Sequence, residues 1–140
     1  MQPETEADID ALVEEFEFLD DWESRYRYLI DLGREMPALL EGEKTEDNRV
    51  KGCASRVWLV IDESGSDTFR FRADSDAHIV KGLAALLVRL FSGRHPDEIG
   101  DIDAREVLSR IGLSEHLSPQ RSNGLNAMIA RIRTEAGIAA

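Results

Sequence analysis

The sequence contains one cysteine, Cys53, in 140 residues. A single cysteine excludes an internal disulfide, a Cys-x-x-Cys redox pair and a metal site built from cysteines alone. The chain also lacks a Walker-type phosphate loop, a Gly-x-Gly-x-x-Gly motif and a His-Glu-x-x-His motif. The histidines, His78, His95 and His116, show no metal-ligand spacing. The sequence therefore predicts neither a resident cofactor nor a resident metal.

Positive charge is also scarce, with 17 Lys and Arg against 28 Asp and Glu and a net charge of -11. Nucleic-acid binding and binding to anionic membranes both depend on basic residues. No apolar stretch approaches the length of a membrane span, and the acidic residues 1–10 lack the pattern of a secretory signal. An unpaired thiol fits a reducing compartment. We therefore expect no nucleic-acid partner, no membrane partner and a cytoplasmic location.

The length and the ordinary hydrophobic content predict a single domain over residues 1–140. Apolar residues recur at helical spacing over residues 5–20, 22–35, 76–91 and from 118 onward, with short helical segments near 96 and 103–112. Residues 57–61 and 68–73 have the pattern of a β-hairpin with a turn at 63–67, and residues 41–48 read as an exposed loop. Because strands and helices are grouped rather than alternated, we predict an α+β fold, with a small antiparallel sheet packed against several helices.

Cys53 follows a glycine, and Arg49, Lys51 and Arg56 lie close to it in the sequence. Nearby cations favour the thiolate, which is the nucleophilic form of cysteine. The alternative is a small buried hydrophobic residue with no chemical role. The local composition favours a reactive thiol, and a spatial Cys–His pair stays open because such partners meet only in the fold.

Two further positions are candidates. Arg121 falls in the first turn of the last helix, where the helix dipole favours an acidic residue. It is either a tolerated surface arginine or a cation held to face an anion such as a thiolate. Asp76 lies in the run Asp74-Ser75-Asp76 at the start of the helix predicted at 76–91, where helix capping alone explains the acidic residues.

Taken together, these segments resemble the SufE family of cysteine desulfuration proteins. The matching blocks are residues 50–58 (VKGCASRVW), 74–83 (DSDAHIVKGL) and 116–128 (HLSPQRSNGLNAM), with a further block at 22–33 (WESRYRYLIDLG). The blocks occur in the family's order and cover nearly the whole chain. The resemblance implies an α+β fold related to the IscU-type scaffold.

The resemblance also implies a function. Cys53 would accept sulfur as a persulfide from a SufS-like, PLP-dependent cysteine desulfurase, stimulate that enzyme, and pass the sulfur to a SufBCD-like iron–sulfur cluster scaffold. Arg121 matches the family's arginine near the thiol, and Asp76 matches an acidic residue beside the loop that carries the acceptor. The chain would then be a sulfur-transfer partner rather than a stand-alone enzyme. Val57 and Trp58, at the start of the first strand, could shelter the persulfide.

Two positions depart from the family pattern, because Ala54 and Arg56 stand where glutamine is frequent. Two other functions stay open at this point. One is a non-covalent, allosteric adaptor of a desulfurase in which Cys53 is incidental. The other is a single-cysteine redox sensor. An iron–sulfur scaffold is disfavoured, because one cysteine cannot supply its ligand set.

Overall fold

The predicted hairpin forms the sheet of the computed structural model, which describes residues 3–64 and 67–138. Strand β1 (Val57–Ser64) pairs antiparallel with β2 (Phe69–Ser75), and a register shift follows Ile61. Phe69, Phe71 and Ala73 alternate along β2 and are buried, as the period-two pattern requires. Residues 65–66 of the predicted turn at 63–67 lie outside the described residues, and 63–64 belong to β1.

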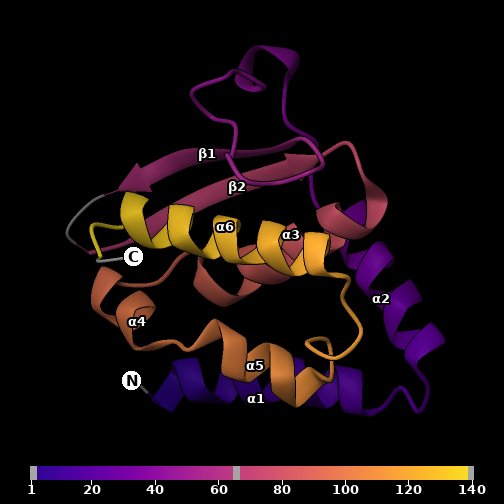
Figure 1. The fold of residues 1–140 in the computed structure, drawn as a ribbon. Helices are drawn as coiled ribbons and strands as arrows, with labels where there is room; N and C mark the ends of the chain where they lie inside the picture. Colours follow the sequence, from indigo (N-terminus) through magenta and orange to yellow (C-terminus); the bar gives the residue numbers. More distant parts are fainter. Residues whose placement is uncertain (1–2, 65–66, 139–140) are drawn as a thin grey trace.

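Helices cover one side of this hairpin (Figure 1). Within the part of the chain that the structure describes, they are α1 (Pro3–Glu17), α2 (Trp22–Glu35), α3 (His78–Phe91), α4 (Pro96–Asp101), α5 (Ala104–Ile111) and α6 (Pro119–Glu135), with a short 3-10 helix, η1 (Glu41–Glu43). The strands lie at one side of the molecule, α3 packs against β2 and α6 against α3, and α1 and α5 lie at the opposite side. This arrangement confirms the predicted α+β class. None of these helices combines the length and apolar character needed to cross a membrane.

Helix α3 is the centre of the packing. Most of its residues are buried, and it contacts β2, α2 and α6. Two glycines allow α2 and α3 to approach backbone to backbone. A Cβ atom on Gly82 would lie 2.3 Å from the Leu29 carbonyl oxygen, and one on Gly33 would lie 2.8 Å from the Gly82 amide nitrogen. The relative position of α2 and α3 is therefore set by a contact that no larger residue permits.

The start of α3 differs from the prediction. The helix begins at His78 rather than at residue 76, and its N-cap, Ala77, has no side-chain capping bond. Ser75 Oγ instead accepts a hydrogen bond from the Ala77 amide at 3.2 Å. The Asp74 and Asp76 carboxylates face other partners, so the three polar residues before α3 join neighbouring segments rather than cap the helix.

Segments before β1 cover the outer edge of that strand. The Val50 amide donates to the Val57 carbonyl at 2.8 Å, and the Leu59 amide donates to the Asn48 carbonyl at 2.8 Å. The preceding residues 41–48 are mostly exposed, as predicted, but they are anchored. Arg72 Nη1 donates to Glu43 at 3.0 Å, and the Lys44 ammonium lies 5.5 Å from the centre of the Trp58 ring.

Candidate functional site

Cys53 is half-buried and lines a pocket of about 360 Å³. Three segments distant in the sequence form this pocket: residues 51–56 before β1, which we call the cysteine loop, the start of α3 and the first half of α6. Its lining residues are Cys53, Ala54, Ser55, Ala77, Ile79, Val80, Leu83, Ser118, Gln120, Arg121, Gly124, Leu125 and Met128. The α3 contribution is apolar, and the polar groups come from the cysteine loop and the N-terminus of α6. The pocket is therefore a mixed surface beside a thiol.

Small residues allow the cysteine loop to lie directly on α6. Gly52 has a φ of +91°, a left-handed conformation that glycine adopts without strain, and a Cβ there would lie 3.3 Å from the Ala127 Cβ. A Cβ on Gly124 would lie 3.6 Å from Cys53 Sγ. The thiol donates a hydrogen bond to the Gly124 carbonyl oxygen, with Sγ and O 3.5 Å apart. The resting thiol therefore faces the backbone of α6.

Burial raises the pKa of the Cys53 thiol, and the Arg49 charge only partly opposes this effect. Lys51 is directed elsewhere, since its ammonium pairs with Glu46 at 2.9 Å. The sequence-based expectation that neighbouring cations favour the thiolate is therefore wrong for this resting conformation. Burial in this conformation therefore favours the protonated thiol.

Arg121 lies in the first turn of α6, as predicted, and lines the same pocket as Cys53. The Ser118 hydroxyl caps the helix by accepting from the Arg121 amide at 3.3 Å. The guanidinium Nη1 donates to the Tyr26 hydroxyl at 2.6 Å and lies over the Tyr26 ring, 5.9 Å from its centre. Arg121 and the N-terminus of α6 therefore lie at the pocket, while the charge that acts on the Cys53 thiol in this conformation is that of Arg49.

Asp76 lies at the base of the cysteine loop and does not line the pocket. Its Oδ1 accepts a hydrogen bond from the Arg56 amide at 3.1 Å, and its own amide donates to the Arg56 carbonyl at 3.3 Å. The structure thus brings Cys53 and Arg121 to one pocket, and it places Asp76 where the loop enters β1.

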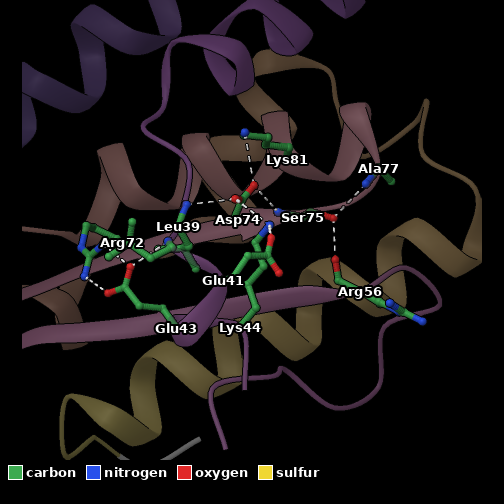
Figure 2. A network of polar contacts seen from close by, with 11 residues as sticks. Leu39, Glu41, Glu43, Lys44, Arg56, Arg72, Asp74, Ser75, Ala77 and Lys81 are labelled. Atoms are coloured by element: carbon green, nitrogen blue, oxygen red, sulfur yellow. Dashed lines mark hydrogen bonds and ion pairs between the residues drawn. The ribbon is translucent and has the colours of Figure 1, made fainter. Parts of the chain in front are cut away.

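The buried carboxylate of Asp74 lies within a network of polar contacts beside the cysteine loop (Figure 2). The sequence pattern alone assigned this residue to helix capping. Asp74 accepts hydrogen bonds from the Leu39 amide at 3.1 Å and the Ser75 amide at 2.8 Å, and it pairs with Lys81 at 3.2 Å. Burial alone would raise the pKa of Asp74, but these hydrogen bonds and the Lys81 charge outweigh burial and lower it.

The same network reaches the cysteine loop. The Ser75 hydroxyl donates to the Arg56 carbonyl at 2.7 Å, next to the contacts of Asp76. Ser75 therefore links the buried Asp74 to Arg56 at the base of the loop (Figure 2). Among the described residues, no cluster of three or more His, Cys, Asp or Glu side chains has the arrangement of a metal site.

Comparisons with known proteins match nearly the whole chain. A family model described as SufE, Fe-S metabolism associated domain, matches residues 10–136. An uncharacterized SufE-like protein of Rhizobium etli is 51% identical over 137 residues, which cover 96% of this chain and 93% of the relative. An uncharacterized SufE-like protein of Rhizobium meliloti is 49% identical over 131 residues, which cover 91% of this chain and 94% of the relative.

A solved structure is similar in fold. The solution structure of a hypothetical protein from Thermus thermophilus matches with a TM-score of 0.73 over 93% of each chain, at 24% sequence identity. At that identity the likeness concerns the fold alone. The family model and the two relatives rest on sequence and span almost the whole chain. The chain therefore belongs to the SufE family of Fe–S metabolism associated domains.

Proposed function

We propose that this chain is a sulfur carrier in iron–sulfur cluster assembly. Cys53 accepts sulfur from a SufS-like, PLP-dependent cysteine desulfurase, and the chain delivers it to a SufBCD-like scaffold. The observation that carries this proposal is the position of Cys53 on the wall of a pocket that Arg121 also lines. The family's association with Fe–S metabolism supplies the context. A carrier with a free thiol requires a reducing compartment, for which we propose the cytoplasm.

The transfer is a thiol exchange without net oxidation. The Cys53 thiolate attacks the outer sulfur of the persulfide on the desulfurase cysteine, and a new S–S bond forms at Cys53 Sγ. The S–S bond of the donor persulfide breaks, and the desulfurase cysteine leaves as a thiolate that takes up a proton. As in thiol–disulfide exchange, the rate depends on the thiolate fraction of the attacker, its nucleophilicity and its access. Removal of the sulfur frees the desulfurase cysteine, which explains stimulation of that enzyme.

The resting site protects the thiol from unproductive reactions. Because burial raises the pKa of Cys53, the thiol stays protonated against the Gly124 carbonyl until the loop leaves α6. The sequence suggested Val57 and Trp58 as shelter for the persulfide, but these residues do not line the pocket. The apolar side chains Ile79, Val80 and Leu83 of α3 line it instead. We propose that they exclude water and oxidants from the bound sulfur.

The other two candidate residues have separate roles in this proposal. Arg121 and the positive end of α6 stabilise the anionic sulfur as it develops in the pocket. Asp76 holds the Arg56 backbone and thus sets where the loop begins to move. A redox sensor reacts with its oxidant without a partner protein and so needs an accessible thiol, whereas Cys53 is half-buried against α6.

The test is intact mass spectrometry of the protein after incubation with a cysteine desulfurase and L-cysteine. We expect a mass gain of one sulfur atom that reductant removes and that Cys53→Ser abolishes. A Cys53→Ser protein that still gains sulfur would refute the assignment of the acceptor. Stimulation of the desulfurase by Cys53→Ala, without sulfur uptake by the wild type, would instead establish the allosteric adaptor.

A further inference from the structure

An aromatic chain of contacts joins Arg121 to the segment that precedes α6. The guanidinium donates to the Tyr26 hydroxyl at 2.6 Å and lies over that ring. Trp22, one helical turn earlier on α2, meets the Tyr26 ring edge-on with ring centres 6.0 Å apart. His116 stacks on Trp22 with ring centres 4.0 Å apart and planes 14° apart. We call Trp22, Tyr26 and His116 the aromatic bracket.

The partner of Arg121 is neutral, which sets it apart from several other arginines of this chain. Those arginines pair with carboxylates, as in Arg72 with Asp62 and Arg89 with Glu15. Over the described ranges 3–64 and 67–138, no carboxylate lies within ion-pair distance of the Arg121 guanidinium, although acidic residues outnumber basic ones by 28 to 17. A carboxylate would orient the guanidinium and cancel its charge. A phenol orients it and leaves the charge in place.

The aromatic bracket is also carried by a helix that is closely packed in the core. Helix α2 carries Trp22 and Tyr26, and α2 is fixed against α3 by the glycine contact at residues 33 and 82. Helix α3 in turn lines the Cys53 pocket. The Tyr26 hydroxyl therefore has a set position relative to the pocket, and the stacked His116 restrains the chain that leads into α6.

We propose that Tyr26 is a positioning residue, which holds the Arg121 guanidinium at the Cys53 pocket and keeps its positive charge available there. This inference rests on the proposed function in one respect, since the charge serves the anionic sulfur of a transfer reaction. It adds that the neutrality of the phenol is what makes Tyr26 suitable. Tyr26 acts through Arg121 and does not itself touch the reacting sulfur.

The experiment compares two small disulfides of different charge as reagents for Cys53. One is 5,5′-dithiobis(2-nitrobenzoate), which is anionic, and the other is 2,2′-dithiodipyridine, which is neutral. In each reaction the Cys53 thiolate attacks one sulfur, the S–S bond of the reagent breaks and a mixed disulfide forms. The other half of the reagent leaves and is measured by absorbance, as a thionitrobenzoate anion from the first reagent and, after taking up a proton, as pyridine-2-thione from the second. The ratio of the anionic to the neutral rate reports positive charge at the pocket, and the thiolate fraction of Cys53 cancels in this ratio.

The variants are Tyr26→Phe, Arg121→Gln and the double variant. We expect Arg121→Gln to lower the rate ratio about fivefold and Tyr26→Phe about threefold, magnitudes typical of losing one charge or one charge-assisted hydrogen bond near a reacting group. The double variant should match Arg121→Gln, because Tyr26 acts through Arg121. The effect in Tyr26→Phe should weaken as salt is added.

Tyr28→Phe is the matched control. It makes the same chemical change on the same helix, but the Tyr28 hydroxyl donates to Glu15, away from the pocket. Its rate ratio should equal that of the wild type. Additive effects in the double variant, or equal ratios in Tyr26→Phe and Tyr28→Phe, would overturn the proposal. If Tyr26→Phe fails to fold, NMR of the wild type decides, since Arg121 side-chain protons without a ring-current shift would also overturn it.

This experiment is independent of the desulfurase. If the wild type takes up no sulfur from a desulfurase but the rate ratio falls as expected, then the proposed function fails and the positioning role of Tyr26 stands. If sulfur uptake occurs and the ratio does not change, then the proposed function stands and the positioning role fails.

Discussion

Replacement of Asp74 by alanine should destabilise the protein by about 3 kcal/mol, because it leaves buried backbone groups without partners. The carboxylate accepts from the Leu39 and Ser75 amides and pairs with Lys81. Each orphaned donor costs about 1–3 kcal/mol, whereas the Lys81 ammonium retains some exposure and can turn toward water. The sum of the two amide contributions, taken near the lower part of this range, gives the estimate.

The assay is urea unfolding at 25 °C and pH 7, followed by circular dichroism, with Asp62→Ala as the matched control. Asp62 also pairs with an arginine of the hairpin, but both side chains are about 40% exposed. Its loss should change the free energy of unfolding by less than about 1 kcal/mol. An Asp74→Ala protein within 1 kcal/mol of Asp62→Ala would refute the reasoning.

The pH dependence gives a second test of the same prediction. The pKa of Asp74 is lower in the folded protein than in the unfolded chain. The unfolded state therefore binds the proton first as the pH falls, and stability decreases in that direction. The contribution of Asp74 is complete above about pH 4, the ordinary value for aspartate. The difference between wild type and Asp74→Ala should be constant from about pH 7 to 5 and shrink below about pH 4.

Three further predictions concern the thiol and the glycines. The rate of Cys53 alkylation by iodoacetamide should rise with pH to a midpoint above the pKa of a free thiol, about 8.5, because burial raises the pKa of Cys53. Arg49→Gln should move this midpoint higher still. A midpoint below that of free cysteine would contradict the buried resting state. Gly82→Ala should cost about 3 kcal/mol in urea unfolding, since its Cβ would lie 2.3 Å from a backbone oxygen; a neutral effect would show that α2 and α3 separate easily. Gly124→Ala places its Cβ at an ordinary contact distance of 3.6 Å from Cys53 Sγ, so it should keep or raise stability through better helix propensity and slow the alkylation of Cys53; faster alkylation would mean that the loop is displaced.

Local signals in the sequence were sufficient for several elements. Helix α2 spans Trp22–Glu35 as predicted, because Asp21 caps its start and Met36-Pro37 ends it, and these signals act within a few residues. The alternation of Phe69 and Phe71 with arginines likewise predicted the buried face of β2. Arg121 was correctly placed in the first turn of α6, after the Ser118-Pro119 start signal.

The remaining features depend on partners far away in the sequence. The predicted start of α3 was wrong because the Asp74 carboxylate accepts from the Leu39 amide and the Asp76 carboxylate from the Arg56 amide. Neither carboxylate is therefore available for capping. The pKa of Cys53 could not be inferred from neighbouring cations, since burial against α6 outweighs them. The contact of Arg121 with Tyr26 likewise joins residues 95 positions apart. Such pairings are set by the packing of helices and not by local pattern.

The backbone pairing of Val50 with Val57 has a mechanical consequence for the proposed sulfur transfer. This pairing closes residues 51–56 into the tip of a hairpin, and the contacts of Asn48 with Leu59 and of Asp76 with Arg56 hold both of its legs. A segment of this length spans about 20 Å when extended, and it must go out and return, so its tip can advance by about 10 Å. The cysteine loop is thus a short segment whose two ends are fixed. In the proposed function, any protein that exchanges sulfur with Cys53 must bring its own cysteine to within that radius, so the geometry of the complex, more than the mobility of the loop, determines which partners exchange sulfur.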